Sequence, residues 1–217
     1  MTVDIKFCGL TRPEDAQYAV TLGATYVGVI FAGGPRSLTP ERALAVLREI
    51  PPGVRRVGVF ANQSASDIAR TVDAVGLDVV QLHGSADARR IGDIRAAVHA
   101  AVWPVVRVAG EILPETTWEL LRLGDGLLLD AFVPGALGGT GVTVAWTALS
   151  NDLQRIRGDA PIILAGGLRP ENVGEAIAAL GPNVVDVSSG VESAPGIKDH
   201  ERMRAFRDAV SNASIPT

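Results

Sequence analysis

The chain has 217 residues, 47% of them hydrophobic, with 24 glycines and 5% aromatic residues, which suits one globular domain with an aliphatic core. Its 20 basic and 24 acidic residues give a net charge of −4 without a basic block, so we expect no nucleic-acid partner. We expect a cytoplasmic protein without a membrane partner, because the first residues form no signal peptide, the one thiol forms no internal disulfide, and no window approaches the about 18 apolar residues of a membrane helix.

Short apolar runs rich in β-branched residues alternate with longer amphipathic stretches along the whole chain. Because the runs are continuous rather than alternating in polarity, they predict strands that are covered on both faces. In chain order, the expected strands span residues 3–8, 26–31, 57–60, 79–82, 102–106, 126–129, 162–165 and 184–187. The expected helices span residues 13–22, 40–49, 65–75, 86–98, 115–123, 145–157, 170–180 and 199–210.

Several of these helices begin with recognisable start signals. Thr11 and Glu14 predict a capping box, with Pro13 in the first helical turn. Ser64 and Asp67 predict a further cap. A proline followed by an acid opens the helices expected at 40 and at 170.

Strict alternation of strand and helix implies an α/β fold with a parallel sheet, and eight units favour a closed (β/α)₈ barrel, the TIM-barrel architecture. We expect one barrel domain over residues 1–210 and a flexible tail over residues 211–217. The alternative is an open doubly wound sheet, but no GxGxxG run follows the first expected strand.

In a barrel of this kind the function lies on the loops that follow the strands. Gly166 and Gly167 follow the seventh expected strand, and Ser189 and Gly190 follow the eighth. Glycines let the backbone approach a ligand closely, and free amides at a helix start favour an anion. We therefore predict a phosphate site on these two turns, with ordinary glycine turns as the alternative.

Asp130 ends the sixth expected strand, after three leucines. A carboxylate beside an apolar core has a raised pKa and can act as a general acid, unless it only caps a turn. The glycine-rich segment 134–143 that follows could close over a ligand and exclude water.

Three more side chains follow strands. Arg36, in a glycine-proline loop after the second strand, suits a carboxylate ligand or is a solvated surface arginine. His83, after the fourth, contacts a ligand or is structural. Cys8, after the first, is either a reactive thiol or a small core residue.

Metal and hydrolase chemistry find little support in the sequence. There is no HExxH run and no cysteine pair, so we expect no metal. A cysteine hydrolase is disfavoured because no oxyanion motif surrounds Cys8 and no orienting partner for His83 is visible.

Taken together, the motifs at these junctions resemble the phosphoribosylanthranilate isomerase family. The segments are KFCGLTRPEDA at 6–16, GVIFAGGPRSLTPERA at 28–43, VGVFAN at 57–62, VQLHG at 80–84, LLLDAFVPGALGGTG at 127–141, ILAGGLRPENV at 163–173 and VDVSSGVESAPGIKD at 185–199. The resemblance runs in order over nearly the whole chain. Each motif alone is weak, but their combination is highly specific.

The resemblance implies an enzyme of tryptophan biosynthesis that needs no metal or organic cofactor. It implies conversion of N-(5-phosphoribosyl)anthranilate to 1-(2-carboxyphenylamino)-1-deoxyribulose 5-phosphate, an Amadori rearrangement. By motif, Cys8 is the general base and Asp130 the general acid.

The resemblance also assigns substrate-binding residues. Arg36 would pair with the anthranilate carboxylate, and His83 and Asp186 would contact the substrate elsewhere in the pocket. The backbone amides that would hold the phosphate belong to Gly166, Gly167, Ser189 and Gly190.

Two departures from the family pattern concern loops. The family often has a lysine and a Phe-Asp-Trp run after GGTG, where this chain has Val142 and Ala145, so the geometry or affinity of the closing loop could differ. The second loop reads AGGPRS, with glycines where bulkier residues are common, and we expect it to move more.

Three other functions compete with this one. Indole-glycerol-phosphate synthase would need a catalytic lysine near a strand end, and Lys6 and Lys198 are the only lysines. A pentose-phosphate epimerase would want histidine and aspartate metal ligands. A non-catalytic phosphate-binding barrel would not need Cys8 and Asp130. The sequence allows a monomer or a homodimer.

Overall fold

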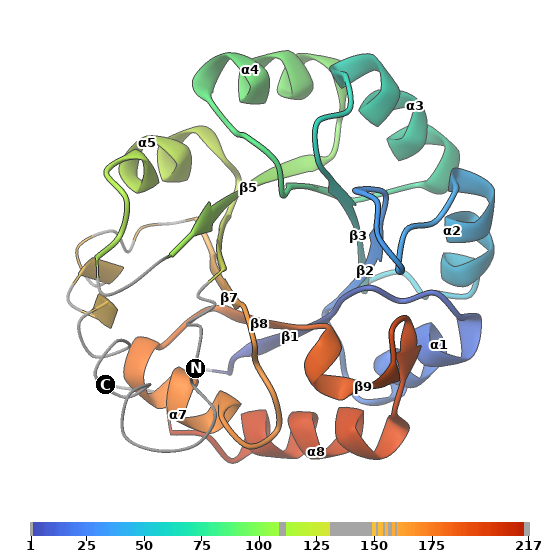
Figure 1. Cartoon of the computed structure of the whole chain (residues 1–217), viewed down its shortest axis with the longest axis vertical. Helices are drawn as coiled ribbons and strands as arrows, with labels where there is room; N and C mark the ends of the chain where they lie inside the picture. Colours follow the sequence, from blue (N-terminus) through green and yellow to red (C-terminus); the bar gives the residue numbers. More distant parts are fainter. Residues whose placement is uncertain are drawn as a thin grey trace.

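In the computed structural model, eight strands form a closed ring with helices around it (Figure 1). The structure describes residues 2–108, 112–130, 149–150, 152–153, 155, 158 and 160–214. The barrel strands are β1 (Asp4–Phe7), β2 (Tyr26–Ile30), β3 (Arg55–Phe60), β4 (Val79–Leu82), β5 (Ala101–Arg107), β6 (Leu127–Asp130), β7 (Ile162–Ala165) and β8 (Val184–Val187). The helices are α1 (Pro13–Thr21), α2 (Pro40–Leu47), α3 (Ala65–Val75), α4 (Ala88–Ala97), α5 (Thr116–Leu123), α7 (Val173–Leu180) and α8 (His200–Ser211).

Every barrel strand lies parallel to its two neighbours, and β1 pairs with both β2 and β8. In the pairing of the first and last strands, Lys6 lies opposite Asp186. This closure confirms the predicted (β/α)₈ barrel and excludes the open sheet. It also leaves no free strand edge in the barrel.

Alternate residues of each strand face the two sides of the barrel wall. The outward residues pack with the helices in one large cluster. The inward residues form a second, smaller cluster, made of Tyr26, Val57, Val79, Trp103, Val105, Leu128, Ile163, Ala165 and Val184. On β1, β4 and β8, the positions in step with this inner cluster are Lys6, Gln81 and Asp186. Lys6 lies opposite Tyr26 and Gln81 opposite Trp103, so the inside of the barrel carries three polar side chains beside this apolar cluster.

The helix starts agree with the sequence at most positions. Pro13 occupies the first turn of α1. The Ser64 hydroxyl accepts a hydrogen bond from the Asp67 amide at 3.1 Å, which confirms the predicted cap of α3. The Thr39 side chain likewise caps α2.

The predicted capping box at the start of α1 is wrong. The residue before the helix is Arg12, and its side chain makes no capping bond. The Thr11 hydroxyl instead donates to the carbonyl of Gly196, in the turn between two short antiparallel strands, β9 (Glu192–Ala194) and β10 (Ile197–Lys198). A hairpin near the other end of the chain thus supplies a better-placed partner than Glu14.

Three further boundaries differ from expectation or lie outside the described residues. The seventh helix begins at Val173 rather than 170, because the Asn172 side chain accepts from the Arg169 amide and closes a turn first. Helix α8 extends one residue into the expected tail, which is not described beyond residue 214. The expected helix at 145–157 falls mostly on undescribed residues, and the loop at 134–143, with Val142 and Ala145, falls wholly on them.

Among the residues that the structure describes, no helix is long and apolar enough to cross a membrane.

Candidate active site

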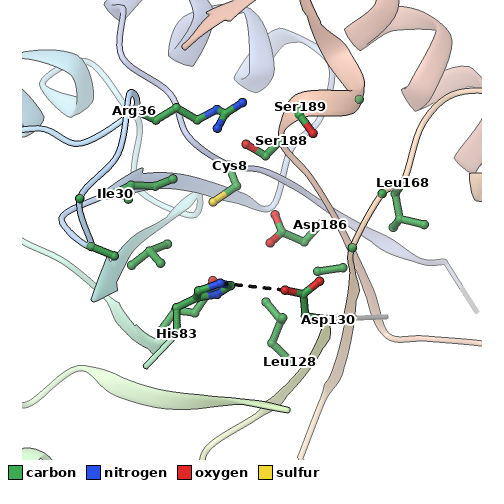
Figure 2. Close-up of a pocket in the computed structure, with 18 residues that line it drawn as sticks. Cys8, Ile30, Arg36, His83, Leu128, Asp130, Leu168, Asp186, Ser188 and Ser189 are labelled. Carbon is green, nitrogen blue, oxygen red and sulfur yellow. Dashed lines mark ion pairs between the residues drawn. The ribbon is translucent and has the colours of Figure 1, made fainter. Parts of the chain in front are cut away.

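A pocket of about 450 Å³ opens at the carboxyl ends of the barrel strands (Figure 2). It brings together the residues that the sequence singled out: Cys8, Arg36, His83, Asp130, Gly166, Gly167, Asp186, Ser189 and Gly190. A larger hollow, of about 990 Å³, lies at the opposite end of the barrel, beside the starts of β3 and β5. Because active sites in such barrels lie at the carboxyl end, the smaller pocket is the candidate site.

The Cys8 thiol lies beside a buried ion pair. Lys6 Nζ donates to Asp186 Oδ2 at 2.8 Å, and the Lys6 side chain is fully buried. The Lys6 ammonium also interacts electrostatically with the Cys8 side chain. Burial raises the pKa of the Cys8 thiol above its ordinary value, and the Lys6 ammonium opposes that rise. The pair therefore places a cation where a thiolate would form.

Gly28 on β2 makes room for this thiol. A Cβ built on Gly28 would lie 3.0 Å from Cys8 Sγ and 3.4 Å from Lys6 Cε. A side chain there would displace the sulfur or the ammonium stem. The Cys8 backbone is held as well, because its amide donates to the Val187 carbonyl at 2.9 Å.

Asp130 faces the same space from β6, as Figure 2 shows. Its carboxylate lies 4.0 Å from His83 Nε2, and its side chain is 23% exposed. Burial raises the pKa of Asp130, and the nearby His83 and Arg107 only partly oppose the rise. This is the direction that a general acid requires.

Three buried polar atoms of residues that line the pocket have no hydrogen-bond partner among the residues that the structure describes. They are Gln81 Oε1, His83 Nδ1 and Asp186 Oδ1. An unpaired buried polar atom costs about 1–3 kcal/mol, so such atoms point to a polar ligand. Sequence reasoning did not single out Gln81, although a lone amide in the apolar run VVQL was a signal for it.

The predicted phosphate turns lie side by side after β7 and β8. Gly166 and Gly167 have φ of +94° and +65°, in the left-handed region where a side chain would be strained. A Cβ on Gly190 would overlap the Leu168 carbonyl, so only glycine allows the two turns to approach this closely. Glycine is required at 166 and 167 by the backbone conformation and at 190 by the lack of space, which the sequence alone could not establish.

Arg36 is neither a solvated surface residue nor a free cation. Its Nε and Nη2 donate to Glu192 Oε1 and Oε2 at 2.8 and 2.6 Å. Glu192 also accepts from the buried Lys198 Nζ at 2.8 Å. Burial alone would raise the pKa of Glu192, but the hydrogen bonds from Arg36 and Lys198 lower it overall.

Sequence reasoning missed Lys6, Lys198 and Glu192, the buried residues that hold Asp186 and Arg36 of the pocket in place. That reasoning considered the two lysines only as candidate catalytic lysines and found them unsuitable. Lys6 interrupts an apolar strand with a charge, which is the pattern of a buried, paired cation. Glu192 stood inside the SSGVE motif without a role of its own.

The chain resembles one family over nearly its whole length. Residues 5–209 match the sequence profile of the family described as N-(5′-phosphoribosyl)anthranilate (PRA) isomerase. A curated relative from Pseudomonas fluorescens, named N-(5′-phosphoribosyl)anthranilate isomerase, is 40% identical over 206 residues, which cover 94% of this chain and 97% of the relative.

Solved structures agree with this comparison. The crystal structure of phosphoribosyl anthranilate isomerase from Thermotoga maritima is similar with a TM-score of 0.86 and 37% identity, covering 97% of this chain and 99% of that one. A phosphoribosyl anthranilate isomerase in complex with reduced 1-(o-carboxyphenylamino)-1-deoxyribulose 5-phosphate has a TM-score of 0.84 and 34% identity, with coverage of 97% and 99%.

Proposed function

The chain belongs to the N-(5′-phosphoribosyl)anthranilate isomerase family, and from this premise we propose that Cys8 is its general base and Asp130 its general acid. Its activity is the isomerisation of phosphoribosylanthranilate in tryptophan biosynthesis. The observation that carries the residue assignment is the barrel order β6-β7-β8-β1. The phosphate turns follow the two strands that lie between those of Asp130 and Cys8, so a phosphosugar held there lies between acid and base.

The first step opens the ribose ring. Protonated Asp130 donates its proton to the furanose ring oxygen, and the bond from that oxygen to C1 breaks. The lone pair of the anthranilate nitrogen forms a double bond to C1, which gives the Schiff base. The raised pKa of Asp130, caused by burial, supports this role because it keeps more of the carboxyl protonated.

The second step moves a proton from carbon. The Cys8 thiolate takes the proton from C2, and the electrons of that bond form a double bond between C1 and C2 while the nitrogen recovers its lone pair. The resulting enolamine then tautomerises to the ketone: its C2 hydroxyl loses a proton and C1 gains one. The step is internally balanced and needs no outside oxidant. The Lys6 ammonium beside Cys8 supports the thiolate.

The remaining residues bind the substrate. The amides of Gly166, Gly167, Ser189 and Gly190 hold the phosphate. Arg36 pairs with the anthranilate carboxylate through the guanidinium edge that Glu192 leaves open. The unpaired atoms His83 Nδ1 and Asp186 Oδ1 contact polar groups of the sugar.

The setting of the protein is part of the proposal. The ligand is a small phosphorylated molecule, as in the complex of the relative with the reduced product analogue. We place the protein in the cytoplasm as a monomer or homodimer. Cell fractionation tests the location, and light scattering of the purified protein tests the assembly.

One assay tests the catalytic assignment. Purified protein is mixed with phosphoribosylanthranilate, and the loss of its anthranilate fluorescence is followed for the parent and for Cys8→Ser and Asp130→Asn. Removing a positioned general acid or base lowers kcat by about 10²–10⁴-fold. Glu201→Gln, an exposed change on α8, serves as the control and keeps parental activity. Full retention of turnover by both variants would overturn the assignment, and an inactive parent would overturn the function.

A further inference from the structure

Glu192 is a buried carboxylate that binds two cations, one of which, Arg36, lines the pocket. Its side chain is 5% exposed and accepts two bonds from Arg36 and one from Lys198. Lys198 Nζ also donates to the Ser188 carbonyl at 3.0 Å, so the ammonium is held by two acceptors. Glu192 itself begins the β9 strand directly after the Ser189–Val191 turn.

The loop that carries Arg36 is closed by backbone hydrogen bonds, from Ser37 N to the Gly34 carbonyl at 3.1 Å and from Leu38 N to the Ile30 carbonyl at 2.8 Å, but these do not involve the guanidinium. Gly33 and Gly34 precede Arg36 with φ of +87° and +83°, and a Cβ on either would meet nothing within 4 Å. Figure 2 shows the Arg36 side chain reaching from this loop towards Ser188 and Ser189. Among the described residues, the hydrogen bonds of the Arg36 guanidinium all go to Glu192, so this bidentate contact sets the plane of the guanidinium.

This geometry leaves part of the guanidinium unused by Glu192. An arginine carries five N–H donors, and the two bonds to Glu192 come from Nε and Nη2 on one edge. The second edge, formed by Nη1 and the other hydrogen of Nη2, is oriented for a second carboxylate. The charges fit as well, because one carboxylate shared by two cations leaves one positive charge for an anionic ligand.

We propose that Glu192 is a positioning residue that fixes the Arg36 guanidinium for the carboxylate at the aromatic end of the substrate. The inference rests on the proposed role of Arg36 and assigns the selectivity for a carboxylated aniline to the Arg36–Glu192–Lys198 cluster. A purely electrostatic view makes the opposite prediction, because removing the negative charge of Glu192 would strengthen the binding of any anion.

The test compares two inhibitors that differ only in the carboxylate. One is reduced 1-(o-carboxyphenylamino)-1-deoxyribulose 5-phosphate, and the other is its counterpart without the carboxyl group. The inhibition constants Ki of both are measured for the parent and for Glu192→Gln. The ratio of the two Ki values isolates the carboxylate contribution. It does not depend on how much of the variant is folded.

We expect the parent to prefer the carboxylated inhibitor by about tenfold or more, the size of one charge-assisted hydrogen bond. Glu192→Gln keeps the side-chain shape but cannot accept the bond from Nη2, so the preference falls by about fivefold. If Glu192→Gln lacks turnover, calorimetry can measure the affinities of the same two inhibitors. Glu192→Asp provides a second variant, in which the negative charge is retained but lies farther from Arg36. An unchanged preference, a stronger one, or an equal loss for both inhibitors overturns the proposal.

Two more variants separate this inference from the function on which it rests. Arg36→Ala should abolish the preference. If it does not, the role of Arg36 itself fails, whatever the result at Glu192. Glu201→Gln removes one negative charge from the exposed surface of α8 and should leave the preference within about twofold of the parent.

Discussion

The two sides of the pocket are built differently. On the β8–β1 side, ion pairs at 2.6–2.8 Å hold Lys6 to Asp186 and Arg36 to Glu192. On the β4–β6 side, His83 and Asp130 lie 4.0 Å apart, and polar atoms of Gln81 and His83 have no hydrogen-bond partner within the described part of the chain. The side of the base is held by ion pairs before substrate arrives, although Asp186 Oδ1 also lacks a hydrogen-bond partner among the described residues, whereas the side of the acid has no such ion pair and is left for the substrate to complete. Changes to the first side should therefore disturb folding as well as catalysis, and changes to the second mainly catalysis.

The largest expected effect is the loss of turnover in Asp130→Asn, by about 10²–10⁴-fold in kcat. Asparagine is isosteric, and burial already disfavours the charge of Asp130. The free energy of unfolding should therefore stay within about 0.5 kcal/mol of the parent. Fluorescence kinetics and urea unfolding on the same preparation check both values. A large loss of stability would erase the contrast between the two sides.

Lys6→Met disrupts the ion pair on the β8–β1 side of the pocket. It leaves Asp186 buried without its cation, which should lower the free energy of unfolding by about 3–5 kcal/mol and also lower kcat. In the double variant Lys6→Met/Asp186→Leu no uncompensated charge remains, so stability should return towards the parent while activity does not. Urea unfolding measures the first effect. Recovery of activity in the double variant would show that Lys6 and Asp186 only support the fold.

The pH profile of kcat should separate the two sides. Activity requires thiolate Cys8 together with protonated Asp130. Both pKa values are raised, but that of Asp130, from 3.8, is expected to stay below that of Cys8, from 9.0. Only a minority of molecules then holds thiolate Cys8 and protonated Asp130 together. This fraction stays constant between the two pKa values. It falls as the pH drops below the pKa of Asp130, and it falls as the pH rises above the pKa of Cys8.

Each limb of the pH profile should shift when a residue on the corresponding side of the pocket is substituted. Lys6→Met removes a cation beside Cys8, so the alkaline limb should move to higher pH. His83→Gln removes a group that lowers the pKa of Asp130, so the acid limb should move to higher pH. Single-turnover rates avoid a limit from product release. A flat profile, or both limbs moving together in either variant, would contradict the assignment.

The smallest expected effect comes from a change away from both sides. Ser64→Ala removes the cap of α3 and should lower the free energy of unfolding by about 1 kcal/mol. Turnover should match the parent. The variant therefore gives the baseline against which a stability loss without a functional loss is judged.

Much of the site could be predicted because it depends on local sequence. The alternation of strand and helix predicts the barrel, and the barrel places the residues after each strand, such as Cys8 and Asp130, around one pocket. The partners of these residues depend on contacts between distant segments. Lys6 meets Asp186 across 180 residues, and Arg36 meets Glu192 across 156. A local sequence pattern contains no information about such distant pairs.

The same reason explains the error at the start of α1. Thr11 and Glu14 form a valid local capping signal, but the Thr11 hydroxyl donates to the carbonyl of Gly196, 185 residues later in the chain. Loop 134–143 remains a prediction, since it lies outside the described residues.

The pairing of β1 with β8 also determines when, during synthesis on the ribosome, β1 can reach its final position. Lys6 emerges early, but its counter-ion Asp186 is made 180 residues later, about 10 to 40 s at ordinary rates of synthesis. Until then the ammonium of Lys6 has to stay hydrated, so β1 cannot settle into its final buried place. The last barrel strand must therefore dock before the thiol beside Lys6 is fully enclosed. Catalytic competence is thus withheld from every incomplete chain, and a nascent polypeptide that stalls before β8 should be inactive however much of the barrel has formed.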